Sequence, residues 1–80
     1  MTYIATFYSH FGAIRYQRLC KQEGYTAITM PVPRNLSSSC GTCVKYDAPE
    51  MLMDPNHDEI EQIVLVTDEG YEQLFKAENS

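Results

Sequence analysis

A helical segment between two strand-like segments constrains the fold of this chain most strongly. Residues 10–23 contain no proline and carry apolar side chains on one helical stripe, whereas 3–8 and 25–32 are rich in aromatic and β-branched residues. Ser9 offers a side-chain oxygen as the N-cap of this helix. Gly24 follows the helix and can end it by taking up the left-handed backbone conformation. The first third of the chain therefore predicts the order strand, helix, strand. The stripe expected to face a core consists of Ala13, Tyr16 and Cys20.

The remaining elements are predicted from shorter signals. Residues 60–67 have a clear β composition, and 68–70 (Asp-Glu-Gly) are typical of a hairpin turn. Residues 71–76 then pair back as a last short strand or form a C-terminal helix. Residues 42–47 are predicted as a strand, with a short helix that begins two residues earlier as the alternative. The intervening stretch 48–58 is expected to be irregular, with one helical turn.

These elements predict one α+β domain over residues 1–80, a single-layer β-sheet with one main helix packed on one face. The order is β-α-β-β-β, as in a fragment of a ferredoxin-like fold. Because 3–8 has few polar positions, we expect this strand to be central. Pro31 and Pro33 remove ladder donors, which places the end of 25–32 at an edge or outside the sheet. So small a domain gains by burying one edge against a second copy, so a homodimer is expected.

Charge is distributed unevenly along the chain. The net charge is −5: residues 1–46 carry five bases against one acid, and 47–80 carry ten acids against one base. Phosphate binding needs a dense basic face, so nucleic acid is not expected as a partner. Two halves that dock on each other or on a second subunit explain the asymmetry better. Without a membrane-spanning run or a signal-peptide pattern, we expect a cytoplasmic protein that makes no membrane contact.

The segment that carries chemistry is 30–43, which joins two prolines, a serine run and a Cys-x-x-Cys pair. The serines offer hydroxyl and backbone N–H donors, Gly41 permits close approach or a positive φ, and Arg34 adds a permanent positive charge. These surroundings favour the thiolate of Cys40, the form that attacks sulfur or binds metal. At this spacing, Cys43 can resolve a bond made at the first thiol. The residues predicted to bind around the thiols are His10, Arg34, Ser37, Ser38, Ser39 and Gly41.

Each of these residues also has a purely structural interpretation. Cys40 and Cys43 can be small buried residues beside a turn, and Cys20 on the helix stripe acts as a small hydrophobe. His10 either approaches the thiols as a proton acceptor or faces solvent. A zinc set that adds His10 and His57 to the two thiols lacks the spacing of a zinc finger. We therefore expect neither a bound metal nor a cofactor.

The order of motifs in the first half of the chain resembles a known family. The motifs are an opening strand, Ser9-His10 before the helix, Gly24, Pro31-Val32-Pro33-Arg34 and Ser37-Ser38-Ser39-Cys40-Gly41. They are similar to those of the DUF3343 family of selenium/sulfur carrier-like proteins. The resemblance implies a small bacterial α+β protein, encoded near sulfur-transfer and selenium-related genes, with Cys40 as the persulfide or selenium carrier. Cys43 is extra to the family pattern.

The sequence thus favours a carrier or binding protein over an enzyme. In this interpretation Cys40 accepts sulfur or selenium from a donor and passes it on, while Arg34 and the serine run hold the anionic adduct. The expected partners are sulfur- or selenium-transfer proteins. Two other functions stay open: a protein-interaction module that uses the exposed loop and the acidic half, and a thiol redox switch that needs Cys43.

Overall fold

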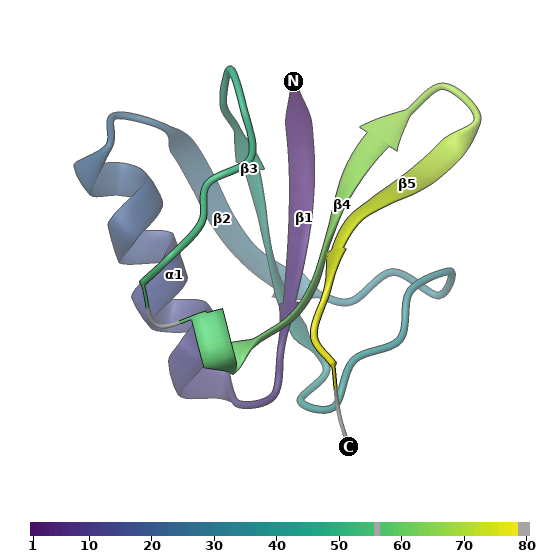
Figure 1. Ribbon diagram of the computed structural model, residues 1–80, viewed down its shortest axis with the longest axis horizontal. Coiled ribbons are helices and arrows are strands. Elements are labelled where there is room, and N and C mark those ends of the chain that lie inside the picture. The colour runs from purple at the N-terminus through teal and green to yellow at the C-terminus, as the bar shows by residue number, and fades with distance from the viewer. Residues whose placement is uncertain (56, 79–80) are drawn as a thin grey trace.

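The computed structural model describes residues 1–55 and 57–78, without the side chain of His57. A five-stranded antiparallel sheet carries one α-helix on one face (Figure 1), which confirms the predicted α+β class. None of the helices in this described part of the chain is long and apolar enough to span a bilayer. In chain order the elements are β1 (Thr2–Phe7), α1 (His10–Gln22), β2 (Thr26–Pro31), β3 (Thr42–Asp47), the 3-10 turn η1 (His57–Glu59), β4 (Ile60–Thr67) and β5 (Gly70–Lys76).

β1 is the central strand, as its lack of polar side chains predicted. The strands lie in the order β2-β3-β1-β4-β5, and each neighbouring pair is antiparallel. β1 and β2 therefore run parallel with β3 between them, and α1 makes the crossover, which is a split β-α-β unit. The elements form only a fragment of a ferredoxin-like fold. The segment between β3 and β4 holds the η1 turn, where the complete fold has a second α-helix.

Strand pairing decides the two alternatives that the sequence left open. Residues 42–47 form a strand, β3, because they pair with β1 on one side and β2 on the other. The last segment is also a strand, β5, which follows a tight turn at Asp68 and Glu69 with Gly70 at φ +132°. β2 is an edge strand, and Pro31 ends it there, where a missing N–H is tolerated.

α1 begins and ends close to the residues predicted. The Ser9 hydroxyl accepts a hydrogen bond from the Gly12 N–H at 3.2 Å, and Gly24 has φ +84° just beyond the helix. Cys20 is the predicted small hydrophobe, and burial raises the pKa of its thiol to about 12. The predicted stripe is fully buried against the sheet: Ala13, Tyr16 and Cys20.

Apolar side chains gather on both faces of the sheet. The larger group lies under α1, includes Phe7, Tyr16 and Tyr46, and is here called the helix-side cluster. In it the Tyr16 hydroxyl donates to the Leu52 carbonyl at 2.6 Å and lies 2.9 Å from the Tyr46 hydroxyl. This pairing satisfies the buried polar atoms of the two rings. The opposite face holds a smaller group, here called the far-side cluster. Its buried members are Ile4, Cys43 and Val64, with Val32 and Leu36 packed against them.

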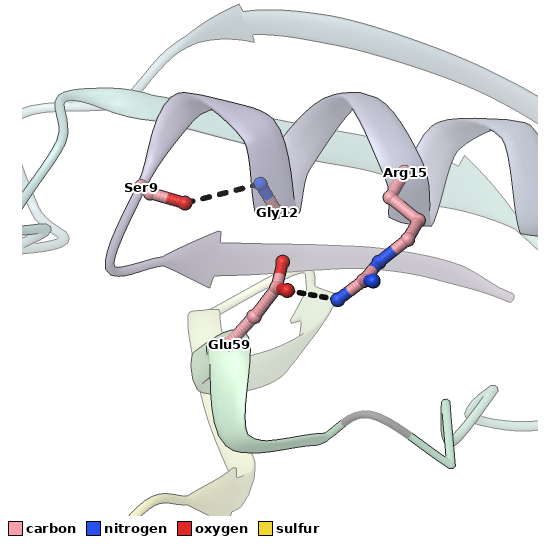
Figure 2. A network of polar contacts seen from close by, with 4 residues as sticks. All are labelled: Ser9, Gly12, Arg15 and Glu59. Carbon is pink, nitrogen blue, oxygen red and sulfur yellow. Dashed lines mark hydrogen bonds and ion pairs between the residues drawn. The ribbon is translucent and has the colours of Figure 1, made fainter.

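The η1 turn is fastened to the first half of α1. Figure 2 shows the Arg15 side chain reaching from the helix to the Glu59 carboxylate, with which it forms an ion pair. Gly12 permits this close approach, because a Cβ there would lie 2.8 Å from Glu59 Oε2. A base of the first half thus pairs with an acid of the second half, as the charge asymmetry suggested.

Candidate thiol site

The Cys-x-x-Cys pair lies where a ten-residue connection, here called the thiol loop (32–41), returns to the sheet. The loop is closed at its base, because the Val32 N–H donates to the Gly41 carbonyl at 3.1 Å and extends the ladder between β2 and β3. Leu36 N–H donates to the Pro33 carbonyl at 3.0 Å, which forms a β-turn. The loop emerges at the end of the sheet where β1 ends and β4 begins (Figure 1).

Two of the three serines anchor the loop to this end of the sheet by neutral hydrogen bonds. The Ser38 hydroxyl donates to the Phe7 carbonyl at the end of β1, at 3.3 Å. The Ser37 carbonyl accepts a hydrogen bond from the Gln62 side-chain amide on β4, at 3.2 Å. The serine run is thus stretched across the ends of two strands.

The third serine is held by a carboxylate. Glu61 Oε1 accepts from the Ser39 N–H and Glu61 Oε2 accepts from the Ser39 hydroxyl, both at 2.8 Å. Hydrogen bonds to an ionised acceptor are shorter and about twice as strong as neutral ones. The donors of Ser39 that were predicted to hold an anionic adduct therefore already hold an anion from the protein itself.

Cys40 follows directly and is half-buried, with its side chain packed against the helix-side cluster. Its Sγ donates to the Thr42 carbonyl at 3.4 Å and lies 3.9 Å from the Ser38 hydroxyl. The next residue, Gly41, has φ +75°, and nothing lies within 4 Å of the Cβ that a side chain would add. Of the two roles considered for Gly41, close approach or a positive φ, the backbone shows the positive φ.

Cys43 occupies a different environment. It is fully buried in the far-side cluster, and its Sγ lies 3.8 Å from the Pro31 carbonyl. Burial is the main cause that raises the pKa of Cys43 to about 11, and the neighbouring Cys40 thiol adds to the rise. Cys43 is therefore protonated at neutral pH, and it packs against a different cluster from the one that Cys40 contacts.

His10 is brought close to the thiol loop through Thr42. Its Nδ1 lies 3.2 Å from the Thr42 hydroxyl, while the carbonyl of the same threonine accepts the hydrogen bond from Cys40. The imidazole at the start of α1 and the Cys40 thiol therefore share one residue as a common neighbour. The structure places His10 at the site by this indirect route.

The structure shows no hydrogen bond between the Arg34 guanidinium and the Cys40 thiol. It is exposed in the β-turn of the loop, and it forms no hydrogen bond or ion pair with any residue that the structure describes. In the same described part of the chain, no group of three or more His, Cys, Asp or Glu side chains is arranged to hold a metal ion. The side chain of His57, named in the zinc alternative, lies outside the described residues.

The comparison with known families matches residues 2–76 to the family described as "Putative Se/S carrier protein-like". The chain belongs to this family. The match runs from the first residue of β1 to the last residue of β5, so it takes in the whole sheet, α1 and the thiol loop. Neither the curated proteins nor the solved structures gave a significant match.

In this Se/S carrier-like domain, sequence reasoning missed Glu61, Gln62 and Thr42. Glu61 and Gln62 begin the β composition of 60–67, and a polar pair at the start of a strand gives no sign of a partner about 20 residues upstream. Thr42 was assigned only to a strand. Its role follows from its position one residue after Gly41, where its carbonyl turns toward the thiol.

Proposed function

We propose that this Se/S carrier-like protein carries one sulfur or selenium atom on Cys40, as a persulfide-type adduct. The observation that supports the proposal best is the exposure of the three cysteines: Cys20 and Cys43 are buried, and only Cys40 reaches solvent. A carrier thiol must meet the reactive groups of both a donor and an acceptor. Membership in the family described as "Putative Se/S carrier protein-like" supports the same function.

The proposed loading step is an exchange without net oxidation. The Cys40 thiolate attacks the terminal sulfur of a donor persulfide, R–S–SH, and a new S–S bond forms at Sγ. The bond between the two donor sulfurs breaks, and the R–S⁻ group leaves with the electron pair and takes up the proton released by Cys40. The products are R–SH and Cys40–S–SH. Selenium follows the same scheme, with R–S–SeH as donor and Cys40–S–SeH as product.

The neighbours of Cys40 suggest how the thiol becomes available. While protonated, the thiol donates to the Thr42 carbonyl, which holds the sulfur in place. A thiolate gives up this hydrogen bond and is repelled by the carbonyl oxygen, so Sγ turns away from Thr42. The Ser38 hydroxyl, 3.9 Å away, donates to the anion once it turns from the Phe7 carbonyl.

Two exposed residues give a donor protein something to recognise. Phe11, directly after His10 in the first turn of α1, is 82% exposed. Arg34 presents from the thiol loop a positive charge that no described residue pairs with. An exposed aromatic ring in the first turn of α1 and a cation on the thiol loop fit a partner that presents an anionic persulfide, and we propose a sulfur- or selenium-transfer protein as this partner.

The test is loading by a cysteine desulfurase supplied with cysteine, followed by intact mass measurement under non-reducing conditions. The wild-type chain is expected to gain the mass of one sulfur atom, and dithiothreitol is expected to remove it. Cys40→Ser should abolish the adduct, whereas the matched variant Cys43→Ser should load like the wild type. A second run with selenocysteine as the source distinguishes selenium from sulfur by mass.

The outcomes separate this proposal from the other two functions. If no donor gives an adduct, the carrier function is contradicted, and the protein-interaction module is the function that remains. An adduct lost in Cys43→Ser as well as in Cys40→Ser points to a redox pair in which both thiols act. The burial of Cys43 and its raised pKa weigh against that pair, because a resolving thiol must reach the first sulfur as a thiolate.

A further inference from the structure

We propose that Glu61 is a positioning residue for the carrier thiol: its carboxylate latches Ser39 and thereby fixes the thiol loop around Cys40. This inference gives the proposed function its geometry and therefore rests on it. The latch consists of the two hydrogen bonds at 2.8 Å from the Ser39 N–H and hydroxyl to the two carboxylate oxygens. Both donors belong to the residue that immediately precedes Cys40.

The strand that carries Glu61 is a firm support. The backbone carbonyl of Glu61 accepts a hydrogen bond from the Ala77 N–H at 2.8 Å. The next residue, Gln62, pairs with Thr6 of β1 and with Lys76 of β5. β4 is thus paired on both sides next to Glu61, which is itself the extra residue of a β-bulge opposite β1, since Thr6 pairs with Gln62 and Phe7 with Ile60. A β-bulge changes the direction of the side chain that it carries, and the paired residues beside it hold that side chain more precisely than a loop would.

The other anchors of the thiol loop are weaker. Between its closed base and Cys40, the loop is otherwise held by the apolar packing of Leu36 against the far-side cluster and by the neutral bonds of Ser37 and Ser38, at 3.2 and 3.3 Å. Only the Glu61 latch uses a charged acceptor and two donors of one residue at once. Loss of this latch should therefore loosen the loop locally without loosening the sheet.

The latch also decides which groups can hold the adduct. While Glu61 occupies Ser39, neither donor of that serine is free for a persulfide anion on Cys40. The adduct is then left with the Ser38 hydroxyl, which must first give up its hydrogen bond to the Phe7 carbonyl, and this weak hold suits a sulfur atom that must be passed on. Glu61 thereby orients the thiol and keeps the strongest nearby donors from trapping the product.

The first readout is the alkylation rate of each cysteine by iodoacetamide, measured by mass spectrometry of peptides. Glu61→Ala should raise the rate at Cys40 about three- to tenfold, because the freed loop exposes the thiol. Glu61→Gln should give a smaller rise, since it keeps one acceptor oxygen and replaces the other with an NH₂ group that cannot accept a hydrogen bond from Ser39. The buried thiols of Cys20 and Cys43 should keep their slow rates and report that the fold is intact. Glu72→Ala, on the exposed face of β5, is the matched control and should change nothing.

The second readout is the rate of loading by the cysteine desulfurase, which should move in the opposite direction. A misplaced thiol in Glu61→Ala should load about tenfold more slowly although it alkylates faster. Glu61→Gln should recover part of the loading rate. A purely structural role would not produce this opposite movement, because general loosening makes a thiol more reactive toward every reagent.

Three results would overturn the inference. One is an unchanged Cys40 alkylation rate in both Glu61 variants; another is faster alkylation of all three thiols, which would make Glu61 a support of the whole fold. The third is loading that rises together with alkylation. If Glu61→Ala does not fold, Ser39→Ala removes one of the two bonds and must give the same opposite movement. A change in alkylation without sulfur loading in any variant contradicts the carrier function but supports the latch.

Discussion

The two thiols of the Cys-x-x-Cys pair differ more than their spacing suggests. Cys40 lies in a polar loop, half-buried, with a backbone oxygen and a hydroxyl as neighbours. Cys43 lies in a central strand, fully buried among aliphatic side chains on the other face of the sheet. The comparison teaches that a cysteine pair cannot be interpreted from spacing alone, because one strand boundary between the thiols is enough to separate their chemistry.

The separation has a local cause. The ladder of β3 begins at Thr42, which pairs with Pro31, and Cys43 is the first residue of β3 paired on both sides, with Met30 and Thr6. From there on, side chains alternate between the two faces, which places Cys43 on the far side. Cys40 precedes the ladder, and Gly41 with its positive φ turns the chain between them.

The largest expected difference between the two regions is in alkylation rate. Cys40 should react with iodoacetamide at neutral pH at least about 100-fold faster than Cys43, because a buried thiol reacts only when the structure opens. Cys20, buried under α1, should be as slow as Cys43. A time course of labelled peptides measures all three rates in one sample. Faster labelling of Cys43 or Cys20 would contradict the assignment of Cys40 as the accessible thiol.

The same substitution at the two thiols should have unequal effects on stability. Cys43→Ser should lower the free energy of unfolding by about 1–3 kcal/mol, because it buries a hydroxyl in an apolar cluster. Cys40→Ser should change it by less than about 0.5 kcal/mol, since Cys40 is partly exposed and has the Thr42 carbonyl and the Ser38 hydroxyl as polar neighbours. Urea unfolding of the two variants beside the wild type gives both values. Equal losses would mean that the two environments are equivalent.

The fold was predictable because its signals are local. The Ser9 cap, the helix stripe, the Gly24 stop and the β composition of the strands each lie within a few residues of the element that they specify. The choice between strand and helix for 42–47 and 71–76 was not predictable, since it depends on pairing with β1, β2 and β4.

The site was predictable only in part, for a related reason. Cys40 and the positive φ of Gly41 follow from residues that are adjacent in sequence. The contact of Ser39 with Glu61 joins residues 22 positions apart and forms only when the thiol loop crosses the end of β1. No periodicity or spacing indicates such a contact, so the serines were predicted as ligands of an adduct although two of them anchor the loop and the third binds a carboxylate.

A smaller effect should appear as the pH is raised. Burial raises the pKa of Cys43 from its ordinary 9.0 to about 11, so above pH 9 the unfolded chain loses this proton before the folded chain does. The stabilisation is complete below pH 9 and is lost as the pH rises toward 11. Cys43→Ala should make the fall in unfolding free energy less steep by up to about 1.4 kcal/mol per pH unit in this window. Urea titrations at several pH values check the slope, and an identical slope in the variant would mean that Cys43 is not shielded from water.

The smallest expected effect concerns the glycine that separates the two regions. Gly41→Ala should cost about 1 kcal/mol, because φ is +75° and the added methyl group meets no neighbour. Gly24→Ala is a matched control, since its φ of +84° and its empty surroundings give a similar cost far from the thiols. Both variants should lose similar stability in urea, but only Gly41→Ala should change the alkylation rate of Cys40, because relief of the strain shifts the chain next to that thiol. Equal alkylation rates in the two variants would show that the turn at Gly41 does not set the position of Cys40, and that the anchors at Ser38 and Ser39 suffice.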